Sequence, residues 1–494
     1  MTRRLVRVLL AGLLLACSAD APDGAGRDAA TAPPLTRLLP SDAVATIGAE
    51  TRLALILKPP AVSRREFTLT LPANAVLHFG FGIPNSSLAE GASGARFAVE
   101  LDDGEGTTPV LDARVDPSQP SHRRWFNVEA DLSAHAGKTV ILAFTVEAEG
   151  DAPPLGVFSD PVVSDAAFVD PRRNLVIVSL DTLRAPSVGS YGYGRETSPY
   201  LDSLAERGAL FEGAITTSVT TGPSHMSLFT GLYPVNHGLS TGLEYKAEPV
   251  STLARVLRAA GYQTTAFTEN GYIVRARGFG DGFSEYTENK AILRKRGPGE
   301  VRVTFGQAQR WLEAPGRARE PFHLFIHTYE VHSPFRPPKE YAALFRDDDH
   351  PGPEDPALRR QRDNYDREIR YVDDKLRELV GTLEERGLME RTLLVITADH
   401  GEEFHEHGRY QHGGAVFDET LRVPLLFLGP DVPPGRHAGQ VSLIDVLPTV
   451  IDYLDVEETA QRDGVSLLPV IRGETDVAPR TLFAEARGKK RWLR

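Results

Sequence analysis

A hydroxyl residue stands at the start of a predicted helix in the stretch 220–231, which reads TTGPSHMSLFTG. Pro223 suits the first turn of a helix, Ser224 can satisfy free backbone amides there, and the apolar residues that follow can pack the helix down. Thr221 would face the positive end of this helix, where an anionic ester or its transition state is stabilised. The stretch therefore predicts either an activated nucleophile or a capped helix without chemistry.

Carboxylate and imidazole side chains follow three predicted strands directly. They are Asp181 after the run 174–180, Asp399 and His400 after the run 392–398, and His327, Glu330 and His332 at the end of the run 322–327. A single Asp after a strand usually caps a helix, but three such strand ends in one domain favour a divalent metal site. The metal's identity stays open, because these ligands together with a hydroxyl accommodate Ca²⁺, Mg²⁺, Mn²⁺ or Zn²⁺.

Two regions with different strand patterns must position these residues. Between residues 43 and 168, short alternating segments separated by turns predict a β-sandwich: 52–57, 66–71, 75–81, 95–101, 125–130 and 139–146. From 172 to 494, continuous apolar runs alternate with helices, which predicts an α/β domain with a mostly parallel sheet flanked by helices. We expect one helix from Pro199, capped by Ser198 and stopped by Gly208, and another over 364–386.

The chain begins with the pattern of an export signal. Three arginines lie in or beside the apolar run 5–16, which is too short to span a bilayer comfortably. The run ends at Cys17, the single cysteine of the chain, in an arrangement that resembles a bacterial lipobox. We therefore expect a lipoprotein-type signal peptide over 1–17, lipidation of Cys17, a flexible linker over 18–42, and membrane anchoring in a bacterial cell envelope, in the periplasm or at the cell surface. An ordinary signal peptide with an unpaired cysteine is the alternative.

The charge and composition of the chain restrict the classes of partner that it can bind. The formal net charge of -12 argues against a general nucleic-acid binder and leaves local basic sites for an anionic substrate open. Residues 125–140 weakly resemble jelly-roll accessory modules of the carbohydrate-binding kind. They show no aromatic platform that requires a sugar, so a spacer module is at least as well supported as a lectin.

Motifs between about residues 172 and 454 together resemble the sulfatase family within the alkaline phosphatase superfamily. They occur in the family's order, at 174–184, 191–193, 198–205, 221–234, 261–264, 327–334, 397–402 and 408–423. The resemblance implies a divalent metal held by Asp181, Asp399 and His400, with Thr221 as a further ligand and as covalent nucleophile. It also implies that His332 contacts the ester or protonates the leaving oxygen, and that His412 lies near the phosphoryl or sulfuryl group or a second metal.

Several positions depart from the family pattern. The sulfatase signature begins with a Cys or Ser that is oxidised to formylglycine, followed by Pro and Arg, whereas this chain has Thr221, Pro223 and His225. The β-carbon of threonine carries a methyl group, so it cannot become an aldehyde. A threonine alkoxide can instead attack phosphorus, as in branches that resemble phosphodiesterases, phosphonate hydrolases and phosphoethanolamine transferases. Thr182 replaces a second acidic ligand of the family, and Glu269 lies in the area where many members have a lysine. The site therefore has less positive charge than a typical sulfatase, which favours a substrate of lower charge such as a diester.

The sequence thus predicts an exported, metal-dependent hydrolase of sulfate or phosphate esters, with phosphodiesters or phosphonates favoured. His332 would act as general acid, while His225 and His412 would bind the anionic ester, either free or linked to a glycan or lipid. A phosphotransferase acting on a surface glycan or lipid is a second reading. A catalytically silent protein that binds a surface polymer is a third.

Overall fold

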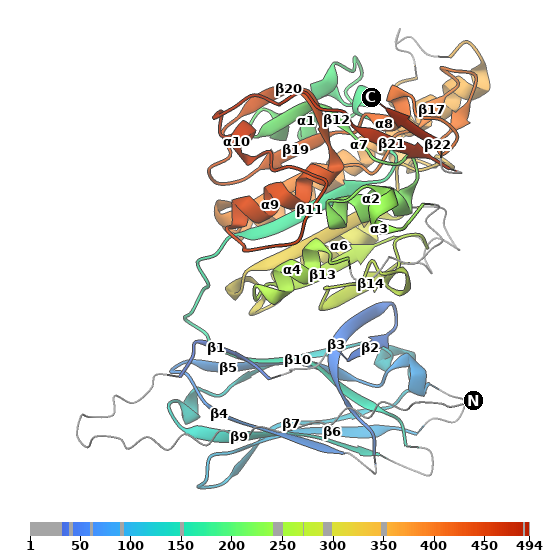
Figure 1. Ribbon diagram of the computed structural model, residues 1–494. Helices are drawn as coiled ribbons and strands as arrows, with labels where there is room; N and C mark the ends of the chain where they lie inside the picture. Colours follow the sequence, from blue (N-terminus) through green and yellow to red (C-terminus); the bar gives the residue numbers. More distant parts are fainter. Residues whose placement is uncertain are drawn as a thin grey trace, which may run out of the picture.

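The computed structural model describes most of the chain (Figure 1). The described residues are 32–38, 43–59, 63–88, 93–148, 153–240, 250–269, 271–289, 299–346, 353–487 and 490–493. The predicted signal peptide, with Cys17, and most of the predicted linker lie outside these residues. The described part divides into a strand-rich N-terminal region and an α/β region, as the sequence predicts.

The N-terminal region is a β-sandwich (Figure 1). One sheet has the order β4 (Arg64–Thr70), β9 (Thr139–Ala148), β6 (Ala95–Asp102), β7 (Thr107–Val115). The other has the order β3 (Glu50–Leu57), β10 (Gly156–Asp165), β5 (Ala75–Gly82), β8 (Phe126–Asp131), with β1 (Leu35–Arg37) on β10 and β2 (Val44–Ile47) on β3. The core between them is rich in phenylalanine, including Phe79, Phe97, Phe144 and Phe158.

Two long strands of the sandwich do not appear among the predicted segments. Strand β7 lies at the edge of its sheet, contains Pro109, and is largely exposed, so it lacks the alternating apolar pattern. Strand β10 is buried along nearly its whole length, but Asp160 and Pro161 interrupt its apolar run. Their pairing with neighbouring strands, which a local pattern does not record, makes them strands.

The α/β region contains an eight-strand portion of sheet. Its order is β20 (Gly435–Ser442), β12 (Ala209–Ile215), β19 (Leu425–Leu428), β16 (Thr392–Thr397), β11 (Asn174–Leu180), β15 (Phe322–Thr328), β13 (Gln263–Thr268), β14 (Glu285–Glu288). Only β19 runs antiparallel to its neighbours within this portion, which confirms the mostly parallel sheet. Two small hairpins stand apart from it: β17 (Glu403–Phe404) with β18 (Tyr410–Gln411), and β21 (Phe483–Ala486) with β22 (Lys490–Leu493).

Helices cover both faces of this sheet (Figure 1). One group contains α1 (Pro199–Ala205), α6 (Val301–Glu313) and α7 (Pro356–Glu385), and α7 contacts both of the others. The other group contains α2 (Thr221–Thr230), α3 (Pro234–His237), α4 (Leu253–Ala259), α9 (Val446–Leu454) and α10 (Leu468–Ile471). A short helix α8 (Asp418–Leu421) precedes β19. The predicted flanking of the sheet by helices is therefore confirmed.

The predicted helix ends need correction. Helix α1 ends at Ala205, before Gly208, and Ser198 makes no side-chain cap bond to it. Gly208 instead lies against β19, where a β-carbon would come within 2.4 Å of the Phe427 carbonyl oxygen. Helix α7 starts at Pro356 rather than 364, because the Asp355 carboxylate accepts a bond from the Ala357 amide while the first turns remain polar and give no apolar period.

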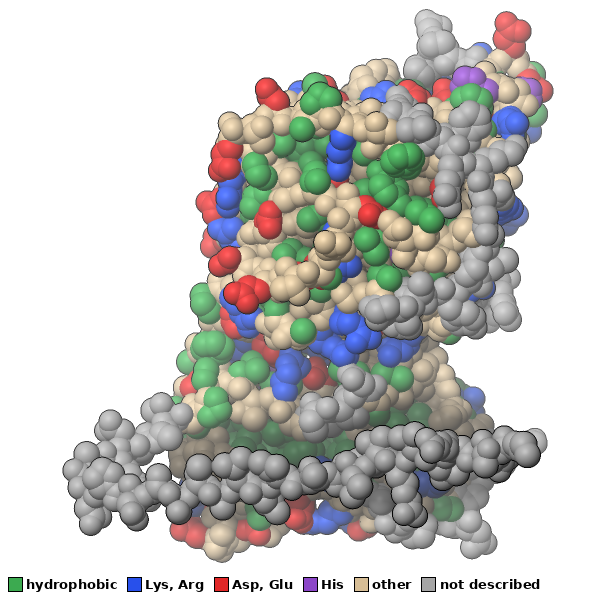
Figure 2. Space-filling view, viewed as in Figure 1, with side chains coloured by type: hydrophobic (Ala, Val, Ile, Leu, Met, Phe, Trp, Pro, Cys, Tyr) green, Lys and Arg blue, Asp and Glu red, His purple; other side chains and the backbone are tan. Residues whose placement is uncertain are grey.

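The two regions share a hydrogen-bonded ladder. Strand β3 of the sandwich pairs antiparallel with β14 at the edge of the α/β sheet, with Arg52 opposite Glu285. Arg37 of the sandwich also forms an ion pair with Glu320, which lies just before β15. Figure 2 shows Lys and Arg side chains gathered where the two regions meet. The sandwich is thus attached at the edge strand β14 and at the amino end of β15.

We predict that Phe144→Ala destabilises the sandwich by about 3–5 kcal/mol, because it deletes a fully buried ring. The rings of Phe67, Phe79 and Phe158 lie 5.8, 5.6 and 5.1 Å from it between centroids. Urea unfolding followed by circular dichroism measures the change. The control Ile56→Ala, at a position that is 39% exposed, should shift stability by no more than about 0.5 kcal/mol. Equal losses in the two variants would contradict the packing described above.

Candidate active site

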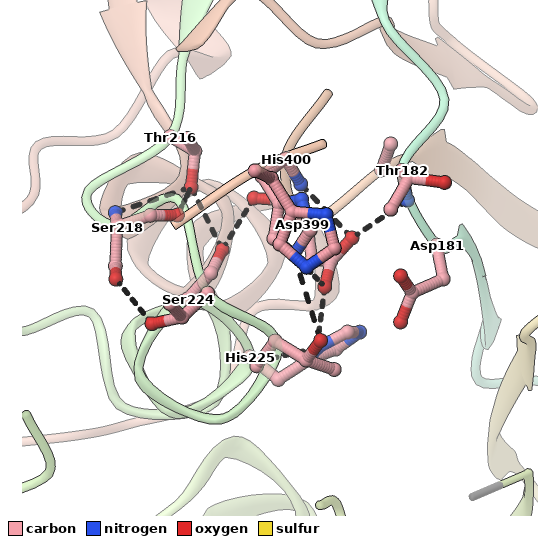
Figure 3. A network of polar contacts seen from close by, with 12 residues as sticks. Asp181, Thr182, Thr216, Ser218, Ser224, His225, Asp399 and His400 are labelled. Carbon is pink, nitrogen blue, oxygen red and sulfur yellow. Dashed lines mark hydrogen bonds and ion pairs between the residues drawn. The ribbon is translucent and has the colours of Figure 1, made fainter. Parts of the chain in front are cut away.

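The ends of two neighbouring strands bring three ligand-type side chains together. Strands β11 and β16 are adjacent and parallel, so Asp181, just beyond β11, meets Asp399 and His400, just beyond β16. One ligand atom from each of these three residues lies within 4.8 Å of the others, and all three residues are buried. Figure 3 shows the cluster beside the first turn of helix α2, which begins at Thr221.

The three side chains fit a divalent cation. Asp181 Oδ1 and Asp399 Oδ2 are buried and have no hydrogen-bond partner among the described residues. Burial, followed by the negative charge of Asp399, raises the pKa of Asp181 well above its usual range. Two buried carboxylates in contact need a positive charge if both are to ionise. A cation held by Asp181, Asp399 and His400 would supply that charge and occupy both free oxygens.

The protonation of His400 suits a ligand role. Its Nδ1 lies 3.1 Å from the Gly401 carbonyl oxygen and therefore carries the proton. Nε2 is left with its lone pair, 3.4 Å from Asp399 Oδ2 and 3.5 Å from the Thr221 hydroxyl oxygen. Burial lowers the pKa of His400 to about 4, so the ring is neutral at pH 7, as metal binding requires.

Neighbouring groups hold the two carboxylates in place. Asp399 Oδ1 accepts hydrogen bonds from the amides of His400 (2.9 Å) and Thr182 (3.2 Å). His327 Nε2 lies 3.1 Å from Asp181 Oδ2 and donates to it, so His327 orients a ligand. Thr182 has a positive φ of 59°, and its hydroxyl donates to the Val331 carbonyl oxygen at 2.7 Å, which directs it elsewhere. The residue in place of a second acidic ligand therefore supports the site through its backbone.

The start of helix α2 is built differently from the sequence prediction. Thr220 is the N-cap and makes no side-chain cap bond, and Ser224 does not satisfy the free amides as predicted. Ser224 lies one position beyond Pro223 inside the helix, and its hydroxyl donates to the Asp399 carbonyl oxygen at 2.6 Å and lies 2.8 Å from the Thr216 hydroxyl (Figure 3). This bond ties the helix start, and with it Thr221, to the metal-ligand segment.

His225 lies beneath Thr221. Its Nδ1 donates to the Thr221 carbonyl oxygen at 2.8 Å, and its Nε2 lies 2.9 Å from the Ser179 hydroxyl. The side chain is fully buried, and burial lowers its pKa. Both ring nitrogens are thus engaged within the protein, and substrate contact by His225 stays a prediction. The contacts observed are those of a support for the backbone of Thr221.

The imidazole rings of the other two predicted histidines, His332 and His412, lie in a row with the ring of His400. The ring of His412 lies 4.3 Å from that of His400 and 4.9 Å from that of His332, between centroids. His332 stacks on Tyr329 at 4.0 Å, and its Nδ1 lies 2.5 Å from the Ser333 carbonyl oxygen. The structure therefore brings His332 and His412 next to the metal cluster, where the predicted roles require them.

Sequence reasoning missed a residue that positions His412. Glu402 is fully buried, and its Oε1 lies 3.2 Å from His412 Nδ1. The remaining oxygen, Oε2, has no hydrogen-bond partner among the described residues. The signal available in the sequence was its place two residues after His400, in a strand-end segment that already supplies two ligands.

Comparisons with known proteins agree with this geometry. The sequence profile of the sulfatase family matches residues 173–456, more than half of the chain. The multifunctional alkaline phosphatase superfamily protein PehA of Trinickia caryophylli is 27% identical over 402 residues, covering 61% of this chain and 77% of that protein. The choline-sulfatase of Rhizobium meliloti is 25% identical over 376 residues, covering 62% and 73%. The crystal structure of the phosphonate monoester hydrolase of Agrobacterium radiobacter has a TM-score of 0.53 and 21% identity, covering 63% and 80%.

The fold and the cluster of carboxylates, imidazoles and a hydroxyl define an α/β ester hydrolase with a candidate metal centre. The chain belongs to the sulfatase family, within the alkaline phosphatase superfamily. Its activity is therefore the hydrolysis of sulfuric or phosphoric esters, and its substrate is an anionic ester. The catalytically silent reading of the sequence is set aside.

We predict that Asp399→Asn lowers the affinity for divalent metal by at least about tenfold, because it removes one ligand charge from a buried site. Calorimetric titration of the chelator-treated protein with Ca²⁺, Mg²⁺, Mn²⁺ and Zn²⁺ measures the affinity and identifies the preferred ion. Asp431→Asn is the matched control, since the Asp431 carboxylate is 69% exposed and pairs with Arg173. Unchanged affinity in Asp399→Asn would remove this carboxylate from the ligand set.

Proposed function

We propose that the protein is an exported, metal-dependent hydrolase that uses Thr221 as a covalent nucleophile and favours phosphodiesters or phosphonate esters. The relatives include a choline-sulfatase and a multifunctional member, so the family alone does not choose among ester classes. The observation that carries the proposal is the identity of residue 221. A threonine stands beside the ligand cluster, where formylglycine chemistry requires a Cys or Ser.

The surroundings of Thr221 support a role as nucleophile. Its hydroxyl oxygen lies 3.5 Å from Nε2 of His400, one of the proposed metal ligands. It is buried at the amino end of α2, where the helix dipole favours negative charge. Both effects favour an alkoxide at this oxygen. A threonine alkoxide attacks a phosphorus centre directly and needs no aldehyde.

The negative charge of the site favours a substrate that carries little negative charge itself. After burial, the negative charges of three neighbouring carboxylates raise the pKa of Asp181: Asp399, Glu402 and Glu269. Glu269 is buried and accepts hydrogen bonds from the backbone amides of Tyr329 (2.8 Å) and Glu300 (3.1 Å). A carboxylate near the position of a common lysine disfavours a dianionic phosphate monoester. A monoanionic diester or phosphonate ester meets less repulsion.

We infer the following reaction from these positions. When bound, a divalent cation would supply positive charge that stabilises the alkoxide and the developing charge on the ester oxygens. The Thr221 hydroxyl loses its proton to solvent and its oxygen forms a bond to phosphorus, while the bond from phosphorus to the leaving oxygen breaks. Water then attacks the phosphothreonine, which releases the product acid and restores the hydroxyl.

His332 is suited to protonate the leaving oxygen once substrate is present. Burial, and then the neighbouring His412, lowers the pKa of His332 to about 3, so it is neutral in the free enzyme at pH 7. Its Nδ1 proton is held by the Ser333 carbonyl oxygen, and an acid role therefore needs a second proton on Nε2. An anionic ester raises the pKa of the imidazolium by direct attraction, which favours that proton in the complex.

We predict that Thr221→Ala loses at least about 1000-fold in kcat on phosphodiester and phosphonate substrates, because it deletes the attacking oxygen. Thr221→Ser keeps the hydroxyl and should retain activity. The measurement is turnover of bis(4-nitrophenyl) phosphate, a 4-nitrophenyl phosphonate monoester, 4-nitrophenyl phosphate and 4-nitrophenyl sulfate, combined with mass spectrometry of acid-quenched enzyme to locate a phosphoryl group.

Thr220→Val is the matched control, because the Thr220 hydroxyl lies 2.9 Å from the Ser218 hydroxyl rather than in the ligand cluster. It should retain most of the activity. Undiminished turnover in Thr221→Ala would exclude the proposed nucleophile. A preference for the aryl sulfate would leave the ester hydrolase intact and reject the phosphorus specificity.

We also propose that the protein is exported and anchored through lipidated Cys17. The proposal rests on the arginines, the short apolar run and the single cysteine of the first 17 residues. None of the helices in the described part of the chain combines the length and hydropathy needed to cross a membrane. An acyl chain on Cys17 would bring the enzyme to the envelope surface.

For the anchor, we expect labelled palmitate to enter the wild-type protein and to be absent from Cys17→Ala when both are expressed in a bacterial host. Because the only cysteine is removed, fractionation should move the variant from the membrane to the soluble envelope fraction. Cys17→Ser is a second variant that preserves side-chain size. Label that persists in both variants would place the lipid elsewhere or show a different attachment.

A further inference from the structure

A cavity of about 200 Å³ lies between the β-sandwich and the α/β region. Strands β5, β8 and β10 form its sandwich side, and residues 314–317, 319 and 320, between α6 and β15, form much of the other. Those residues precede β15, whose opposite end carries His327 beside the metal cluster. A strand of seven residues spans roughly 20 Å, so the cavity is separate from the active site.

Arginines neutralise three carboxylates of the cavity wall, those of Asp160, Glu285 and Glu320. Arg37 pairs with Asp160 at 2.8 Å and also with Glu320. Arg317 pairs with Glu285 at 2.5 Å. Of these ion pairs, the one between Arg37 and Glu320 joins the sandwich to the α/β region. The negative charges of these three carboxylates are therefore balanced by arginines and do not by themselves select a cationic ligand.

Two buried polar atoms at the cavity lack partners. Arg319 Nη1 and His78 Nε2 are both buried and make no hydrogen bond within the described part of the chain. No carboxylate among the described residues forms an ion pair with Arg319. Buried donors of this kind are nearly always satisfied in native proteins, so a ligand or solvent is required here.

The positions of these two groups are fixed by the backbone. Gly316 has a φ of 78°, and a β-carbon there would come within 2.6 Å of the His78 ring, so only glycine lets the segment pass over the imidazole. Burial, and then the positive charges of Arg319 and Arg317, lowers the pKa of His78 to about 4. The local field at the ring is thus positive, as an anion site requires.

We propose that this cavity binds a small oxyanion, a sulfate or phosphate group, through Arg319 and His78. The guanidinium donates from Nη1, and the imidazole donates from Nε2. A bound anion favours the imidazolium, whose Nδ1 lies 3.6 Å from the Glu129 carboxylate, the cavity acid that has no arginine partner. The oxyanion is either free in solution, as the product of ester hydrolysis is, or carried by an unreacted part of a polyanionic substrate.

The test is calorimetric titration of chelator-treated, full-length protein carrying Asp399→Asn, which lowers the affinity of the catalytic site for metal, with inorganic sulfate, inorganic phosphate and a sulfated oligosaccharide. We expect one anion to bind, and adding Arg319→Gln should weaken it by at least about tenfold. Arg319→Lys should give an intermediate loss, because it keeps the charge but not the fork of donors. Thermal melting confirms that each variant is folded.

The matched control is Arg207→Gln, at an arginine whose side chain is 53% exposed and pairs with Glu384. It should leave binding unchanged. Binding of the inorganic ions identifies a free anion as the occupant, and Arg319-dependent binding of the oligosaccharide alone identifies a substrate-borne group. Absence of binding by all three probes, or equal affinity in Arg319→Gln and its parent, overturns the proposal while leaving the Thr221 result unaffected.

Discussion

Two buried carboxylates of like charge, Asp181 and Asp399, set the conditions that the rest of the α/β region meets. Each is at most 1% exposed and each keeps one oxygen without a partner. Such a pair is unfavourable unless a positive charge lies between them. Adjacent parallel strands hold the pair together, since each residue lies within two positions of the end of its strand. The sheet thus holds two carboxylates that repel each other close enough to bind one cation.

The surrounding shell turns this pair into a directed site. His327 donates to Asp181, two amides donate to Asp399, and the Ser224 hydroxyl binds the backbone of Asp399 from the first turn of α2. The last bond has a consequence for chemistry, because it fixes the helix start, and hence Thr221, relative to the ligands. A nucleophile supplied by a helix start needs such a link, since even small displacements at a reacting centre are costly.

The sequence predicted the parts of this arrangement that depend on strand order and strand ends. Apolar runs located β11, β15 and β16 closely, and polar residues directly after them located Asp181, Asp399 and His400. Local pattern could not record contacts that form only in three dimensions. Ser224 looked like a helix cap, yet it binds a carbonyl group of another strand's end, and Thr182 looked like a missing ligand, yet it supports Asp399 through its amide. Glu402 was visible as a neighbour of His400, but its bond to His412 depends on how the following segment folds back.

The two ends of the parallel sheet have different roles because of the way the sandwich is attached. The carboxyl ends of β11 and β16 hold the ligand cluster, whereas the sandwich contacts the edge strand β14 and the residues before β15. The sandwich is thus fixed away from the strand ends that carry the ligand cluster. Because β3 continues the same ladder of hydrogen bonds, the sandwich adds strands to the sheet rather than resting against it. At that junction the ion pair between Arg37 and Glu320 secures the attachment, and Glu320, Glu285 and Arg317 also line the cavity that Arg319 faces.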